Sequence, residues 1–567
     1  MILSFSLFDD GSLPFDYILT LIPSLSLIGI IAYVTFWLLS WTLSSFLMLW
    51  RRRQPEEEER STSSYKSTAA AAGPTILTLL LLGLALDAPE MNRTTTSSRT
   101  STASHHHNNN ESSIHHPTTF GDGIYDFIQG HDTEKLSELL NAMDNDDILQ
   151  GPTPPRLFSN RHLQFLPWLI QNEIHRQEGI PFERHTVEVT SCKEWLDEYD
   201  DECTPDPLMT DQVTLDVFPP FDASKFSTSA FNKSSPIILF IPGLRCYSQD
   251  MPGNMIIRRA YAEGFRSIVM NRRGHTPGMP LKAPRWNLFG DTNDLEQVYW
   301  YIKEELAHDS RVPMFLHGIS SGTSVGVSSL GIWDERRRRR QEQRQGSNTT
   351  STTSSKRPIP TFVASLAMVP GYDISKVMQR DRFRFPYNQL FVPLVQDHFV
   401  QQNEDILRSY NSKAVDRILS AQTLQEFVDE SVVFAGYQNK QEYYKQTNPI
   451  NNIVGLTTPL LVVNAADDPC CLVDNIYETS PSSHNNNMTY ADMARASPNT
   501  MIVVTKTGTH CPFLDAANAG WFGQLFPKMI PDPLNPNGRY MLDSWGDRVA
   551  IQYYKAALQV YGDRRFL

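Results

Sequence analysis

Short apolar runs alternate with amphipathic stretches from about residue 119 to the C-terminus. Two runs, 186–189 and 213–217, alternate apolar with polar residues, as half-buried antiparallel strands do. Six later runs are continuously apolar, as in strands that a parallel sheet buries on both faces: 237–241, 267–271, 314–317, 362–369, 460–464 and 501–505. Intervening stretches such as 293–306 have helical spacing. The pattern predicts an α/β fold over 119–567, with an eight-stranded, mostly parallel sheet and helices on both faces.

The first 118 residues follow a different pattern. Residues 17–50 are almost continuously apolar, long enough to cross a bilayer as a helix, and Arg51–Arg53 follow them. A cleavable signal peptide would have a basic start and a shorter apolar core. We therefore predict an N-terminal transmembrane helix within a membrane anchor at 1–55. A disordered, low-complexity linker is expected at 56–118, and its apolar segment 69–86 is borderline for a second span.

Two orientations in the membrane are compatible with the sequence. The positive-inside rule places Arg51–Arg53 in the cytoplasm, so a single-pass chain keeps its folded region there and a two-pass chain returns it to the lumen. Only in the lumenal case are Asn92 and Asn232 candidate glycan acceptors, and only there could Cys192 and Cys203 bridge a loop. We expect the endoplasmic reticulum or another endomembrane as the location.

Charge narrows the range of partners. The formal net charge of the 567-residue chain is -13, whereas nucleic-acid binding needs a clustered positive field. We therefore expect no nucleic-acid partner. The dense basic run Arg336–Arg340 borders a Ser/Thr-rich tract, and we interpret about 334–357 as a solvated, disordered insertion.

The string Gly-Ile-Ser-Ser-Gly at 318–322 directly follows an apolar run and precedes small residues. This is the layout of a nucleophile elbow, a sharp strand-to-helix turn that exposes a serine hydroxyl and leaves little room for neighbouring side chains. The overlapping string at 322–326 also fits, but its Ser324 would lie one turn inside the helix. We therefore predict an α/β-hydrolase fold with Ser320 as the nucleophile.

A serine hydroxyl needs an imidazole to accept its proton and a carboxylate to orient that imidazole. In this fold the acid follows the seventh strand and the base follows the eighth. Asp467 and Asp468 follow the seventh apolar run, and His510 follows the eighth. We favour Asp468 as the acid because it directly precedes Pro469, where such hydrolases usually place it, and we assign His510 as the base.

Backbone amides are the expected donors to the oxyanion of the reaction intermediate. Ser321 N–H follows the nucleophile, and Leu244 N–H follows a glycine turn after the third strand. An aromatic-rich insertion at about 372–454 is expected to form a lid over an acyl pocket, although its aromatics equally suit an ordinary lid core.

The six cysteines match no zinc signature, so we predict neither a metal nor a cofactor. Four of them, Cys246, Cys470, Cys471 and Cys511, flank the predicted site. Their role stays open, with inert buried thiols as the default interpretation.

Further motifs accompany the elbow and the two strand-end loops: Asn160–Gln164, Asn271–Gly274, and Gly290-Asp291 with Asp294-Leu295. Together they resemble the membrane-anchored esterase and lipase group of the AB-hydrolase superfamily (AB-hydrolase-4 type), which includes monoacylglycerol lipases, phospholipases and medium-chain acyl ester synthase-hydrolases. The resemblance covers about residue 160 to the C-terminus. It implies nucleophile, acid and base positions for Ser320, Asp468 and His510.

The chain departs from that group at two positions. Pro242-Gly243 stands where the group usually has His-Gly, and Gly508-Thr509-His510 stands where it has Gly-Gly-His. The expected function is a membrane-anchored serine hydrolase of lipid or medium-chain acyl esters, acting through an acyl-enzyme. The alternatives are an acyltransferase that passes the acyl group to an alcohol, and a catalytically silent lipid or steroid sensor.

Overall fold

The computed structural model describes ten ranges of the chain: 122–143, 145–192, 205–222, 231–250, 253–346, 357–378, 387–479, 488–516, 524–535 and 539–562. The predicted membrane anchor, the linker at 56–118 with its apolar segment, and Cys203 lie outside them. Within the described ranges, no helix combines the length and the apolar character that crossing a bilayer requires.

Nine strands of the described residues form one sheet in the order β1-β9-β8-β7-β6-β4-β5-β3-β2. Their bounds are β1 Ile124–Gln129, β2 Glu183–Cys192, β3 Pro205–Phe218, β4 Ile237–Ile241, β5 Arg266–Asn271, β6 Met314–Ile319, β7 Ala364–Met368, β8 Leu460–Ala465 and β9 Thr500–Thr505. Strands β4 to β9 are parallel to their neighbours in that set, whereas β1, β2 and β3 pair antiparallel. Two short strands, β10 Met529–Pro531 and β11 Tyr540–Leu542, form a separate hairpin.

From β2 to β9 the sheet follows the predicted α/β-hydrolase plan, which is confirmed. The expected total of eight strands is wrong by one, because β1 adds a further antiparallel strand beside β9. Its pairing with β9 shifts register between Ile124 and Asp126, and its burial does not alternate along the strand. The period of two that reveals a half-buried strand is therefore missing from this segment.

Helices follow most strands. The α-helices are α5 Thr133–Ala142, α6 Asn145–Gln150, α7 Phe165–Glu178, α8 Gly253–Ala262, α9 Thr292–Tyr301, α10 Gly322–Gly346, α11 Ile374–Val377, α13 Gln389–Val395, α14 Glu404–Ser420, α15 Leu424–Ser431, α16 Lys440–Thr447, α17 Tyr490–Ala496 and α19 Trp545–Tyr561. Shorter turns of helix are η2 Arg156–Phe158, η4 Ile302–Leu306, η6 Gln396–Val400, η7 Gln401–Asn403, η8 Pro449–Asn452 and η9 Val473–Tyr477.

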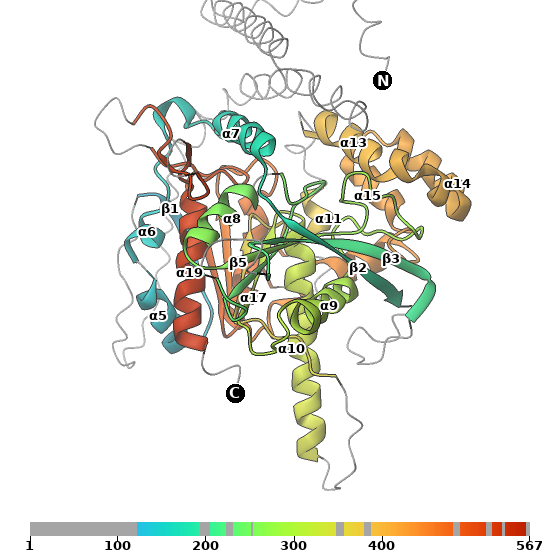
Figure 1. The fold of residues 1–567 in the computed structure, drawn as a ribbon, viewed down its shortest axis with the longest axis horizontal. Coiled ribbons are helices and arrows are strands. Elements are labelled where there is room, and N and C mark those ends of the chain that lie inside the picture. Colours follow the sequence, from blue (N-terminus) through green and yellow to red (C-terminus); the bar gives the residue numbers. More distant parts are fainter. Residues whose placement is uncertain are drawn as a thin grey trace, which may run out of the picture. The chain divides into compact units, whose positions relative to one another are not determined.

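The sheet is buried on both faces. In β4, Ile237 and Leu239 belong to the core shared with α9, α10 and α17, while Ile238 and Phe240 belong to the core shared with α5, α8 and α19. Figure 1 shows α8 and α19 on one side of the strands and α9 and α10 on the other. All four side chains are fully buried. Because successive side chains of a strand point to opposite faces, a continuously apolar run is what two covering layers require.

The segment expected to be disordered from residue 334 is in part helical. Helix α10 continues to Gly346, so the expectation is wrong for 334–346, while 347–356 lie outside the described residues. Ion pairs support this extension: Arg336 pairs with Glu296 of α9, and Arg338 and Arg339 both pair with Glu335 one turn away. Such pairs at helical spacing stabilise a helix that composition alone marks as solvated.

The insertion between β7 and β8 is built from helices α11 and α13–α16 and has its own core. Trp286, from the loop before α9, stacks on Phe399 of η6 with ring centroids 5.0 Å apart. Tyr387 and Val395 of the aromatic-rich stretch are buried in the same core, whereas Phe383 and Phe385 lie outside the described residues. Leu244 also packs against this core, so the insertion contacts the loop that follows β4.

Candidate active site

Ser320 occupies the sharp turn between β6 and α10. Its φ is 51°, in the left-handed region, and its carbonyl oxygen accepts a hydrogen bond from Thr323 N–H at 3.0 Å. A Cβ added to Gly318 would lie 2.7 Å from Thr323 Cα, and one added to Gly322 would collide with main-chain oxygens at the end of β4. Both glycines of the elbow are therefore required by the close approach of the backbone.

The structure brings Ser320, His510 and Asp468 together. His510 Nε2 lies 2.9 Å from Ser320 Oγ, and His510 Nδ1 lies 2.9 Å from Asp468 Oδ2. The Asp468 side chain is buried, and its second oxygen, Oδ1, accepts hydrogen bonds from Cys470 N–H at 2.7 Å and Cys471 N–H at 2.8 Å. With a proton on Nδ1, the imidazole donates to the carboxylate and accepts from the serine hydroxyl, which is the arrangement that proton abstraction from serine requires.

The loop that carries His510 has an unusual backbone. Thr509, Cys511 and Phe513 have φ values of 50°, 90° and 41°, and Gly508 has a φ of 149°. A Cβ on Gly508 would also overlap the Phe513 ring, 2.6 Å from Cε1. Position 509 thus takes a conformation that favours glycine, and the β-branched Thr509 adopts it at a cost of about 1–3 kcal/mol.

Asp467 points to a different partner. Its Oδ1 accepts from Thr509 N–H at 2.7 Å and its Oδ2 from Gln164 Nε2 at 3.3 Å, and in the described part of the chain no hydrogen bond joins it to His510. Burial raises the pKa of Asp467 to about 7, against the lowering effect of the Thr509 hydrogen bond. Asp467 therefore holds the backbone of Thr509, the residue before His510, while Asp468 contacts the His510 imidazole itself.

The two predicted oxyanion donors belong to segments that adjoin Ser320. A Cβ on Gly243 would lie 3.2 Å from Ser320 Cβ, so the loop that leads into Leu244 passes directly beside the serine. Neither Leu244 N–H nor Ser321 N–H donates a hydrogen bond to any other described residue. Both amides are available to a ligand atom.

Arg272 is a residue to which the sequence motifs assigned no role. Its NH2 group donates to Pro242 O at 3.0 Å, Gly243 O at 3.0 Å and Ser321 Oγ at 3.2 Å, and its NH1 group donates to Leu288 O at 2.8 Å. The side chain is 4% exposed, and no carboxylate among the described residues pairs with it. Burial lowers the pKa of the guanidinium to about 10.

Arg272 directly follows β5, at the carboxyl end of a parallel strand. Loops at that end of the sheet build the site in this fold, so this position could have marked Arg272 as a site residue from the sequence. The neighbouring motif residues are structural. Arg273 forms a two-bond ion pair with Asp294 at 2.7 and 2.6 Å, and Asn271 Nδ2 donates to Asp216 Oδ2 at 2.9 Å.

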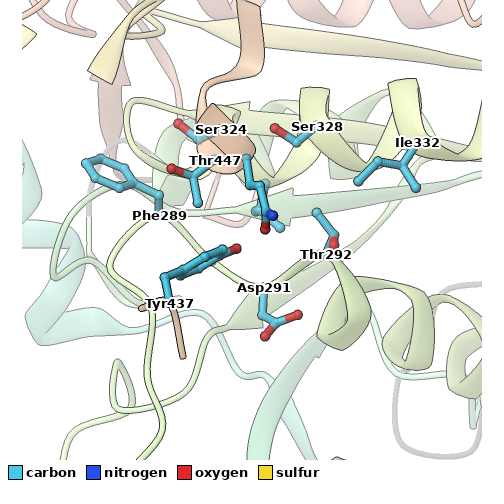
Figure 2. Close-up of a pocket in the computed structure, with 11 residues that line it drawn as sticks. Phe289, Asp291, Thr292, Ser324, Ser328, Ile332, Tyr437 and Thr447 are labelled. Atoms are coloured by element: carbon cyan, nitrogen blue, oxygen red, sulfur yellow. The ribbon is translucent and has the colours of Figure 1, made fainter. Parts of the chain in front are cut away.

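Ser324, the overlapping candidate, lies inside α10 as predicted. It lines a pocket with Phe289, Asp291, Tyr437 and Thr447, and Figure 2 shows it on the same helix as Ser328. None of Ser320, Asp468 and His510 lines this pocket.

Comparison with known proteins places the chain beside lipases. No protein-family model matches it. The monoacylglycerol lipase ABHD2 of Danio rerio is 24% identical over 332 residues, which is 57% of this chain and 64% of the relative. The phospholipase ABHD3 of Mus musculus is 23% identical over 308 residues, 54% of this chain and 64% of the relative. The chain is a relative of the AB-hydrolase lipases ABHD2 and ABHD3.

The match to these AB-hydrolase relatives extends over slightly less than two thirds of their own length. Among solved structures, an esterase of Pyrococcus furiosus has a TM-score of 0.30 and 12% identity, over 58% of this chain and 85% of that one. The predicted resemblance to the AB-hydrolase group is confirmed by the curated relatives.

Proposed function

We propose that this AB-hydrolase relative is a membrane-anchored serine carboxylic ester hydrolase acting on lipid or medium-chain acyl esters. The observation that carries the proposal is the hydrogen-bonded series from Ser320 Oγ through His510 to the buried Asp468. The names of its relatives, monoacylglycerol lipase and phospholipase, support an acyl ester of a lipid as the substrate class.

The reaction begins when Ser320 Oγ attacks the acyl carbonyl carbon and His510 Nε2 takes the hydroxyl proton. Asp468 holds the imidazole in the required tautomer and stabilises the imidazolium that forms. The negative charge on the former carbonyl oxygen is met by the amides of Leu244 and Ser321. His510 then returns its proton to the leaving alcohol.

The acyl-enzyme is resolved by the same groups. His510 removes a proton from water, the hydroxide attacks the acyl carbon, and the proton passes back to Ser320 Oγ as the fatty acid leaves. One ester and one water are consumed, and one acid and one alcohol are released.

Arg272 acts in this scheme as a positioning residue. Its guanidinium binds the carbonyls of Pro242 and Gly243, directly before Leu244, and also the Ser321 hydroxyl. One rigid cation therefore links the two chain segments that supply the oxyanion amides. Donors that are already in position stabilise the oxyanion without moving during the reaction. Because the oxyanion develops only in the transition state, holding these donors lowers the activation free energy and leaves substrate binding unchanged.

The membrane part of the proposal rests on the sequence. The apolar stretch at 17–50 supports anchoring in a membrane, and the stretch at 69–86 is borderline for a second span. The membrane that we propose is the endoplasmic reticulum or another endomembrane. An anchored enzyme meets its substrate at the bilayer surface, and the helical insertion of residues 372–454 provides a cover for an acyl chain.

A fluorophosphonate probe tests the proposal, because it reacts with an activated serine hydroxyl. We expect the full-length chain to be labelled, Ser320→Ala to abolish labelling, and Ser324→Ala to retain it, since Ser324 lines a pocket that does not include Ser320, Asp468 or His510. A wild-type chain that stays unlabelled beside a reactive control hydrolase would favour the silent sensor. If only Ser324→Ala lost labelling, the nucleophile would be Ser324 rather than Ser320.

A further inference from the structure

Among the described residues, three side chains with metal-binding atoms from two loops lie together: Asp468, Cys470 and His510. One ligand atom from each lies within 4.8 Å of the others. Asp468 and Cys470 are 1% and 7% exposed, and the three come from the loops that follow β8 and β9. Ligands drawn from two loops explain why no zinc spacing is visible in the sequence.

The three donor atoms select a class of metal. A carboxylate oxygen, an imidazole nitrogen and a thiol sulfur together suit Zn²⁺, whereas Mg²⁺ and Ca²⁺ take oxygen ligands. Bonds of about 2.0–2.3 Å around a tetrahedral Zn²⁺ place its ligand atoms about 3–4 Å apart. The ligand atoms of Asp468, Cys470 and His510 lie within 4.8 Å of one another, which is close to that spacing.

We propose that Asp468, Cys470 and His510 form an inhibitory Zn²⁺ site that blocks the proposed hydrolase. The metal binds the ring nitrogen that faces Asp468, Nδ1, and the ring keeps its one proton on Nε2. The Cys470 thiol releases its proton to solvent as the sulfur–metal bond forms, so carboxylate and thiolate balance the two charges of Zn²⁺.

Inhibition follows from the tautomer. In the active arrangement His510 Nε2 accepts the proton of Ser320 across 2.9 Å. In the metal-bound arrangement Nε2 already carries a proton, so it has no lone pair to offer, and Asp468 is engaged by the metal. The inhibitory effect rests on the proposed function, whereas metal binding itself does not.

The chain supplies a matched control. Cys471 adjoins Cys470, is also buried, and donates its N–H to the same Asp468 oxygen, yet it is not part of the three-residue group. Exchange of either thiol for a hydroxyl removes one sulfur from the same loop. Only Cys470→Ser removes a ligand.

The experiment measures metal binding and labelling separately on the full-length chain. Co²⁺, a spectroscopic substitute for Zn²⁺, is titrated alone, and its thiolate-to-metal absorption band is recorded. We expect the band in the wild type and in Cys471→Ser, and its loss in Cys470→Ser and in His510→Ala. Two variants at different ligands guard against the misfolding of one.

Zn²⁺ is then titrated against the rate of fluorophosphonate labelling. We expect inhibition that a chelator reverses, and a half-inhibitory Zn²⁺ concentration at least about 10-fold higher in Cys470→Ser, since even an outer partner of a metal site changes affinity by that factor. Equal inhibition of Cys470→Ser and Cys471→Ser, or a Co²⁺ band that survives in Cys470→Ser, overturns the proposed site. If no protein is labelled at all, the proposed hydrolase fails, and the Co²⁺ band still decides the metal site.

Discussion

Replacing Arg272 by lysine tests its proposed role in holding the loop that carries Leu244, one of the two proposed oxyanion donors. The guanidinium spreads its donors over two nitrogens, with Leu288 O on NH1 and Pro242 O, Gly243 O and Ser321 Oγ on NH2. A lysine ammonium keeps the positive charge, but its single nitrogen cannot occupy both positions. At least one buried carbonyl is left without its donor, which costs about 1–3 kcal/mol.

The effect on the reaction follows from the place where those bonds are lost. Loss of a complete oxyanion donor lowers kcat by about 100- to 1,000-fold, and here the donors remain while their support loosens. We therefore expect Arg272→Lys to lower kcat about 10- to 100-fold, or about 1.4–2.8 kcal/mol in activation free energy. KM should stay within about threefold, because the oxyanion exists only in the transition state and intermediate.

The assay measures kcat and KM with a medium-chain p-nitrophenyl ester, together with the melting temperature. Arg273→Lys is the control, because Arg273 is equally buried in the same motif but pairs with Asp294 away from the elbow. It should lower stability without a selective fall in kcat. The positioning role of Arg272 is refuted if Arg272→Lys raises KM at unchanged kcat, or if its activity falls only as far as its folded fraction does.

Three further predictions concern the acid, the base loop and pH. Asp468→Asn should lower kcat by about 10,000-fold, because the asparagine favours the wrong imidazole tautomer of His510. Asp467→Asn should retain activity within about 10-fold, because its amide oxygen still accepts from Thr509 N–H. Steady-state kinetics that show the reverse order would exchange the roles of the two aspartates. Gly508→Ala should lower both kcat and melting temperature, since its φ is 149° and the added Cβ meets a ring, while Gly455→Ala, with no atom within 4 Å, should change neither; equal effects would contradict this account of the loop. Burial lowers the pKa of His317 from 6.5 to about 3. Between these pH values the unfolded chain binds a proton on this histidine and the folded chain does not. The free energy of unfolding therefore falls as pH drops from about 6.5 towards 3, by at most about 1.4 kcal/mol per pH unit. Denaturant unfolding at several pH values should show a shallower fall in His317→Asn, and an identical slope in both proteins would exclude this histidine as a cause.

Several features of the fold could be predicted because their cause is local. Six strands are covered on both faces, so each had to be a continuous apolar run, and the helices between them show their period within one stretch of chain. The elbow is local as well, since Gly318 and Gly322 are needed by contacts within a single turn and with the adjacent strand. In contrast, β1 escaped prediction because its place beside β9 depends on a partner more than 370 residues away.

The candidate site divides in the same way. The order of serine, aspartate and histidine along the chain follows from the order of the strands, so Ser320 and His510 could be named from position alone. Asp468 could be favoured over Asp467 as the acid from the proline that follows it, but no role could be assigned to Asp467. Adjacent residues on a turn point in different directions, and only the folded loops show that Asp467 meets Thr509 N–H while Asp468 meets the imidazole.

Tertiary packing alone also gives Arg272 and Cys470 their surroundings. An arginine after a strand is ordinary in sequence, and it becomes a link to the loop after β4 only when the carbonyls of Pro242 and Gly243 are brought to its guanidinium. A cysteine after Pro469 is equally ordinary until the loop after β9 brings His510 beside it. Spacing along a chain specifies which groups leave the sheet at one edge, whereas hydrogen-bond geometry depends on how loops from distant strands pack against each other.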